Sequence, residues 1–123
     1  MRRKTGMWIP FLLFLMLLGC GGAAPPDRQM VSAEAAIRGA QELGAASVSE
    51  ASLYLRLAER QVDKAKVLMR DGNNQRAAMM LSRAQIDAEL AIALAKENTA
   101  TTEAQEAENT VVELQDKMKR LGR

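Results

Sequence analysis

The sequence of 123 residues predicts an all-α protein, and three observations support this class. Beyond residue 26 the apolar residues are mainly Ala, Leu, Met and Val, interleaved with charged and amide residues that form helices readily. No proline follows Pro26. Apolar residues recur at spacings of three and four, the period of an α-helix. We therefore expect a helical hairpin with a short first helix and a long C-terminal helix, either straight or kinked, as in a small bundle or coiled coil.

The first residues have the composition of an export signal. The basic residues Arg2-Arg3-Lys4 precede the apolar run Met7–Leu18, whose 12 residues fall short of the roughly 20 that span a bilayer. The next residues complete the run Leu17-Leu18-Gly19-Cys20, which resembles the lipobox of bacterial lipoproteins. This resemblance implies cleavage between Gly19 and Cys20, a diacylglycerol on the Cys20 sulfur and an acyl chain on the new amino terminus. The alternative is an ordinary secretory signal, with Cys20 as an incidental apolar residue.

The lipobox interpretation divides the chain into three parts. Residues 1–19 are the signal peptide, residues 20–31 are the lipidated cysteine with a flexible tether, and residues 32–123 form the helical domain. Two or more acyl chains anchor a protein stably in a membrane. No aspartate follows Cys20, and by analogy with lipoprotein sorting in enterobacteria we expect an outer-membrane lipoprotein that faces the periplasm. The inner membrane and the cell surface stay open as alternatives.

Charge and residue types exclude several classes of function. Three of the 17 basic residues lie in the signal, which leaves 14 basic residues against 15 acidic ones and a net charge of −1. Such a chain has no electrostatic footprint for nucleic acid. With one cysteine and no histidine, neither an intramolecular disulfide nor a Cys/His metal site can form. We expect no metal, and no cofactor besides the lipid.

Turn and cap signals predict the ends of three helices. The first helix is expected over residues 32–43, ending at Gly44 in a left-handed conformation. The second begins near Ser47, where Ser47 and Glu50 have capping-box spacing, and ends at Arg70. The third begins after Asn73 or Asn74 and continues to Leu121. The short turn between the last two predicts an antiparallel hairpin over residues 48–97.

Two apolar stripes define the expected core. Small side chains at most of these positions would let the helices approach closely, although each alanine buries little area. The stripes are Ala51, Leu55, Ala58, Val62, Ala65 and Met69 in the second helix, and Ala77, Leu81, Ala84, Ala88, Ala91 and Ala95 in the third. Larger residues are expected to complete the core against the first helix, namely Leu53, Tyr54, Leu57, Leu68, Met80, Leu90 and Leu94.

Residues 98–121, which we name the C-terminal arm, carry a stripe of their own. At roughly 1.5 Å per residue the second helix can cover only the first half of the third. The poor helix formers around Thr101 fall at the boundary, and Thr102 with Gln105 could cap a new helix. The arm therefore either continues the third helix, which we favour, or folds back. Its stripe, the candidate interaction surface, begins at Ala100 and continues with Ala104, Ala107, Val111, Leu114, Met118 and Leu121.

Charge is segregated along the arm. Acidic residues lie from Glu97 to Asp116 with no Lys or Arg among them, and Lys117, Lys119, Arg120 and Arg123 follow. One interpretation is a solvated face with basic residues that complement the helix dipole. The other is a docking surface for a basic partner, or for an antiparallel copy that pairs acid with base.

The helical region resembles a known family. The segments that carry the resemblance are Ala33–Ala36 with Gly44, Leu57–Arg60, the Asp71-Gly72 turn and, most specifically, Ala84–Ala95. They are similar to the bacterial envelope lipoproteins catalogued as domain of unknown function 4398. In that family the helical domain often stands beside an OmpA-like peptidoglycan-binding domain. No such segment follows here, so we expect no direct binding of peptidoglycan.

The residues favour a non-catalytic protein. Histidine, the commonest general acid or base, is absent, and the lipid consumes Cys20. The leading hypothesis is a lipid-anchored helical interaction or structural module that binds a protein partner or itself through the arm. The alternative is a periplasmic carrier of a small apolar ligand or lipid, in which Met69, Met79 and Met80 adapt to the ligand.

Overall fold

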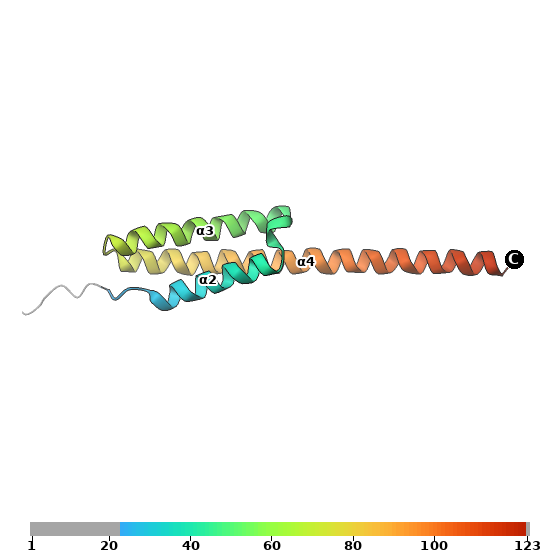
Figure 1. The fold of residues 1–123 in the computed structure, drawn as a ribbon, viewed down its shortest axis with the longest axis horizontal. Helices are drawn as coiled ribbons and strands as arrows, with labels where there is room; N and C mark the ends of the chain where they lie inside the picture. The colour runs from blue at the N-terminus through green and yellow to red at the C-terminus, as the bar shows by residue number, and fades with distance from the viewer. Residues whose placement is uncertain (1–22, 123) are drawn as a thin grey trace, which may run out of the picture.

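The computed structural model describes residues 23–122, and its described elements are all helical (Figure 1). They are α2 (Asp27–Glu42), the short 3₁₀ turn η2 (Ala45–Ser47), α3 (Ser49–Arg70) and α4 (Asn74–Leu121). This confirms the predicted all-α class, with a short first helix and a long C-terminal one. The predictions on Gly19 and Cys20 lie outside the described residues.

Helix α2 begins earlier than the sequence pattern predicts. Its first residue is Asp27, directly after Pro26, so residues 27–31 belong to the helix and not to the tether. The amide of Met30 donates to the carbonyl of Pro26 at 3.0 Å, which starts the helical hydrogen-bond ladder. Asp27 in the first turn also complements the positive end of the helix dipole. The expected start at Ser32 is therefore five residues too late.

Between α2 and α3, the predicted end of the first helix at Gly44 is confirmed, whereas the capping box predicted at Ser47 is wrong. Gly44 has φ of +73°, the left-handed conformation expected of it. The Ser47 hydroxyl donates to the carbonyl of Gly44 at 2.7 Å, within the η2 turn. It caps no helix, because α3 begins at Ser49 and extended Val48 occupies the N-cap position.

A glycine turn reverses the chain between α3 and α4. Gly72 has φ of +75°. Its amide donates to the carbonyl of Met69 at 3.0 Å, and the amide of Asn73 donates to that of Leu68 at 2.8 Å. These two bonds form a Schellman motif, which satisfies carbonyls at the end of α3. The two helices therefore lie antiparallel, as predicted.

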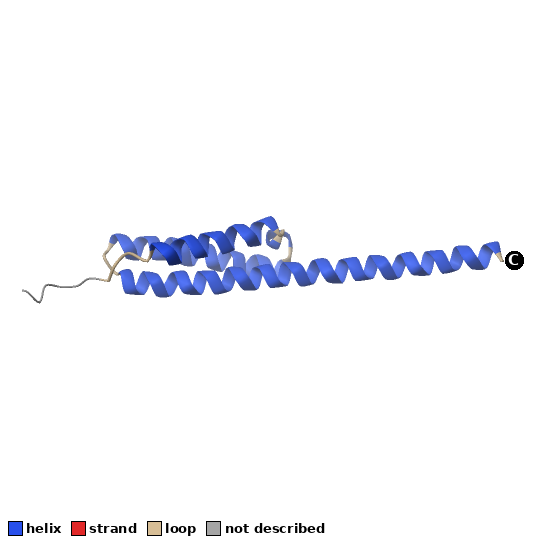
Figure 2. Ribbon diagram, turned by 90° about the horizontal axis from the view of Figure 1, so that it is seen from below, coloured by secondary structure: helices blue, strands red, loops and turns tan. Residues whose placement is uncertain are grey.

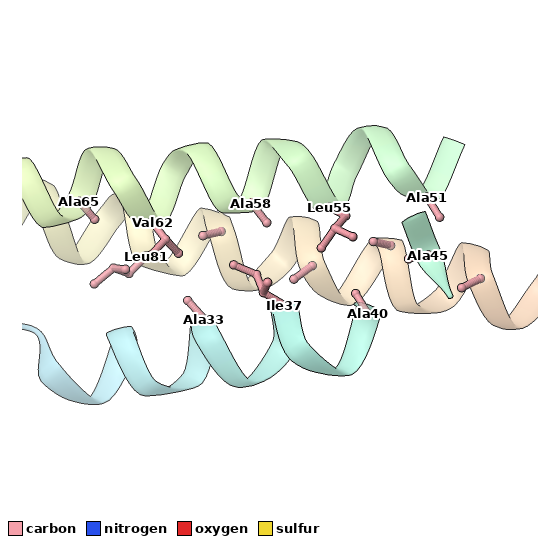
Figure 3. Close-up of a cluster of buried hydrophobic side chains, with 14 of the residues drawn as sticks. Ala33, Ile37, Ala40, Ala45, Ala51, Leu55, Ala58, Val62, Ala65 and Leu81 are labelled. Atoms are coloured by element: carbon pink, nitrogen blue, oxygen red, sulfur yellow. The ribbon is translucent and has the colours of Figure 1, made fainter. Parts of the chain in front are cut away.

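The core is a seam made mostly of alanines between α4 and the other two helices. Figure 3 shows Ala51, Leu55, Ala58, Val62 and Ala65 of α3 and Leu81 of α4 pointing into it. All six predicted residues of the α4 stripe are buried, as are the first five of the α3 stripe, and Met69 is partly buried. Helix α2 contributes Ala33, Ile37 and Ala40, which the sequence analysis did not identify. The small side chains allow α4 to pack closely against both neighbours.

Polar contacts between the helices flank this seam. Gln61 of α3 donates to the carboxylate of Asp87 of α4 at 2.6 Å. Lys66 of α3 forms a salt bridge with Glu34 of α2 at 3.0 Å, and Gln41 of α2 donates to Glu59 of α3 at 2.9 Å. Each helix of the bundle is thus joined to a neighbour by at least one polar pair outside the core.

The two described ends of the chain lie at opposite ends of the molecule. The side-chain amide of Asn74, at the start of α4, donates to the carbonyl of Ala23 at 2.6 Å. Helix α2 then runs alongside α4 in the same direction, and α3 runs back (Figure 1). Figure 2 shows from a second direction that α4 extends far beyond the bundle. The first described residue, Ala23, thus lies at the end of the bundle opposite the arm.

Candidate interaction surface on the C-terminal helix

The arm continues α4 without a break. Helix α4 has 48 residues, which corresponds to a length of about 72 Å. At the predicted boundary, the hydroxyls of Thr99 and Thr102 donate to the carbonyls of Ala95 and Asn98, four residues back, at 3.1 and 2.9 Å. Both threonines thus satisfy their hydroxyls inside the helix. The predicted cap at Thr102 is wrong, and the arm does not fold back.

Every residue from Lys96 to Gly122 is exposed, so the bundle buries none of the side chains of the arm. This includes all the predicted interaction residues. Ala104 and Ala107 are exposed, and the exposed fractions of Val111, Leu114, Met118 and Leu121 are 52%, 54%, 66% and 88%. The structure therefore presents the predicted stripe as one continuous apolar face on an unaccompanied helix. Such a face is typical of a surface that binds a partner.

The arm stripe does not continue the alanine seam. With 3.6 residues per turn each residue advances by about 100°, so the step of five from Ala95 to Ala100 turns the apolar face by roughly 140°. A partner on the arm stripe would thus approach α4 from the side away from α2 and α3. The arm stripe and the bundle do not compete for the same face of the helix.

The outer face of α4 extends the arm stripe back along the bundle, which the sequence analysis missed. Met79, Ile86 and Leu90 have exposed fractions of 55%, 63% and 39%, and Ala93 is also exposed. Positions 79, 83, 86, 90, 93, 97 and 100 alternate between spacings of four and three, so they share one face of α4. Five of these positions are apolar, and the other two are the charged residues Arg83 and Glu97. The regular spacing from Leu90 through Ala93 to Ala100 and Ala104 was the available signal. We name the apolar residues on this face of α4, from Met79 to Leu121, the outer stripe.

Two leucines predicted for the core lie at the surface instead. Leu90 belongs to the outer stripe, and Leu53 of α3 is 50% exposed. Tyr54, Leu68, Met80 and Leu94 do pack against the core, as predicted. For Leu90 the reason is that α3 and α2 cover only one side of α4, so a large apolar residue on the opposite side of that helix has no neighbour to contact.

Charges along the arm are separated as the sequence indicates. Lys117 forms a salt bridge with Glu113 at 2.8 Å, and Lys119 lies 3.9 Å from Asp116. Both pairs are exposed and stay within the last turns, so each contributes little to stability. At the base of the arm lies a groove of about 260 Å³, whose lining includes Glu50 of α3 and Glu97 of α4. The groove at the base of the arm is therefore acidic, with exposed Lys96 next to it, and the tip of the arm is basic.

A second groove bears on the carrier hypothesis. This groove lies between α2 and α3, is open to solvent and has a volume of about 580 Å³. Met30, Val67 and Met69 line it together with charged residues. Of the three methionines predicted to hold an apolar ligand, only Met69 lines it. Met79 lies on the outer stripe and Met80 packs against the core, so the structure does not bring the three together around this groove.

Within residues 23–122 we find no cluster of three or more potential metal ligands from His, Cys, Asp and Glu. Over the same range, none of the helices combines the length and apolar character that crossing a membrane requires.

Comparison with protein families identifies the helical region. A family model described as a domain of unknown function, DUF4398, matches residues 28–107, well over half of the chain. The chain belongs to the DUF4398 family. Neither a search of curated proteins nor a search of solved structures found a match. The DUF4398 match includes α2 from its second residue, α3 and α4 as far as residue 107. The large apolar residues of the arm lie beyond it, namely Val111, Leu114, Met118 and Leu121.

Proposed function

We propose that this DUF4398 protein is a non-catalytic, lipid-anchored protein of the cell envelope whose C-terminal arm is a helical interaction surface. The observation that carries the interaction surface is the exposed stripe of Val111, Leu114, Met118 and Leu121 on the part of α4 that no other described residue covers. The lipobox-like run ending at Cys20 supports the anchor.

The arrangement of the chain fits this role. The tether leaves beside Asn74, at the end of the bundle opposite the arm, as the bond from Asn74 to Ala23 indicates. With Cys20 lipidated, the bundle would stand next to the membrane and the arm would extend from its far end. About 36 Å of helix lies in residues 98–121, so the stripe would be presented beyond the bundle, at the end of the chain far from its own lipid.

The anchor is tested by replacing the proposed lipid attachment site. We expect the full chain, expressed in bacteria, to fractionate with membranes and to carry a mass equal to residues 20–123 plus lipid. The Cys20→Ser variant should lack the lipid mass and leave the membrane fraction. Mass spectrometry of both fractions measures this. An unmodified Cys20 in the parent chain would contradict the lipid anchor.

The arm is tested by photo-cross-linking in the same cells. We expect a photoreactive residue at Val111 to give a discrete cross-linked product, because the arm stripe faces its partner. The same residue at Arg60 is the control, since Arg60 is exposed on α3 and away from the outer stripe. Equal products from both positions, or none from Val111, would show that the arm is not the interaction surface.

A further inference from the structure

We propose that the arm pairs with the arm of a second copy of this chain, in antiparallel orientation. This inference rests on the proposed function, because it names the partner of the same surface. Two observations carry it, namely the gradient of side-chain size along the arm stripe and the separation of charge along the arm.

The size gradient distinguishes the two orientations. The first half of the arm stripe is small (Ala100, Ala104 and Ala107), and the second half is large (Val111, Leu114, Met118 and Leu121). Parallel pairing sets alanine against alanine at one end and large side chains against each other at the other, so the spacing between helices would be uneven. Antiparallel pairing sets small against large at each internal position of the stripe, which allows an even spacing.

One register satisfies this condition at every internal layer. Residues whose numbers add to 218 lie at the same level, so Ala100 faces Met118 of the second copy, Ala104 faces Leu114 and Ala107 faces Val111. In this register Leu121 lies level with Glu97 of the second copy. The two arms then overlap over their whole length, and each tip ends where the bundle of the other copy begins. Since the arm stripe points roughly 140° away from the alanine seam, the tip passes outside the bundle.

Charge favours the same orientation. Parallel pairing brings Glu103 of each copy beside Glu108 of the other, and places the two acidic segments side by side. Antiparallel pairing brings Glu103 beside Lys117 of the second copy, twice by symmetry, and sets the basic tip near the acidic base formed by Glu50 and Glu97. At the centre of the dimer, Glu108 of one copy lies beside Glu108 of the other. This is a single repulsive pair, against two attractive ones.

The antiparallel dimer has a defined geometry. The two α4 helices would begin at Asn74 in each copy, roughly 105 Å apart along the common axis. Their tethers would leave from opposite ends, so a dimer with both lipids in one membrane would lie along the membrane surface. The dimer would therefore be a rod with a bundle at each end and the paired arms in the middle.

Single cysteines test the pairing and its direction. The chain has one cysteine, so the Cys20→Ser form of residues 20–123, which contains all the described helices, accepts new thiols without interference. In the proposed register, residue 108 lies near its own copy, whereas the two copies of residue 100 lie about 27 Å apart along the axis. Glu108→Cys and Ala100→Cys, treated with a short thiol-reactive cross-linker, therefore report opposite orientations.

We expect covalent dimers from Glu108→Cys and few from Ala100→Cys, with at least a tenfold difference in yield. Dimers from Ala100→Cys alone would mean parallel pairing and overturn the proposal. Equal yields from both would overturn it as non-specific contact. No dimers from either, with a monomer in sedimentation, would exclude a second copy. The proposed function would survive that last result if photo-cross-linking at Val111 gave a product of a mass other than twice the chain.

Discussion

The double variant Val111→Glu with Leu114→Glu is expected to abolish association of the chain while leaving its helices intact. In the proposed dimer these residues face Ala107 and Ala104 of the second copy, so four carboxylates would be buried between the arms. Burying unpaired charge costs several kcal/mol. We expect the dimer dissociation constant to rise at least 100-fold, which corresponds to about 2.8 kcal/mol.

The helix itself should tolerate the change. Val111 and Leu114 are 52% and 54% exposed in the single chain, and glutamate is a good helix former. Circular dichroism should therefore be nearly unchanged, while light scattering after size exclusion measures the loss of dimer. Val112→Glu is the matched control, because Val112 is 57% exposed but lies off the arm stripe. Equal weakening by the control would mean that added negative charge, and not the arm stripe, is responsible.

The second large effect is expected from Leu81→Ala in the alanine seam. Leu81 is the largest fully buried side chain in the described residues, with an exposed fraction of 0%. The buried residues of the seam are mostly alanines, whose side chains are too short to fill the space that would be left. We expect the free energy of unfolding to fall by about 2–5 kcal/mol, measured by urea unfolding followed at the helical circular dichroism signal.

Leu90→Ala serves as the control for this stability measurement. It makes the same chemical change in the same helix, but Leu90 is 39% exposed on the outer stripe. We expect a loss below about 1 kcal/mol, since less apolar surface is withdrawn from water at this position. If the two variants lost equal stability, Leu81 would not lie at the centre of the packed seam.

The sequence predicted the alanine seam well because its pattern and its partner are both local. Ala51 to Ala65 and Ala77 to Ala95 keep the helical period, and the Gly72 turn brings the two stripes together within one hairpin. The exposed arm was predictable for a similar reason. Helix α3, with 22 residues, is less than half the length of the 48-residue α4 and cannot cover it.

The two predicted caps and the placement of Leu90 could not be predicted from the sequence pattern, because they depend on where the helices begin and how they pack. Neither Ser47 nor Thr102 caps a helix, because α3 begins only at Ser49 and α4 continues unbroken through residue 102, so neither hydroxyl meets the free N–H groups of a helix start. Leu90 illustrates the main difficulty. Both faces of α4 carry apolar residues at helical spacing, and only the placement of α2 and α3 decides which face is buried.

The central claim is that the arm stripe is a surface for association, and sedimentation velocity tests it most directly. The sample is residues 20–123 with Cys20→Ser, across a dilution series at micromolar concentrations. We predict an elongated dimer that dissociates on dilution, and a monomer at all concentrations for the Val111→Glu, Leu114→Glu variant. Sedimentation of the parent chain and the variant as the same species at every concentration would contradict the claim.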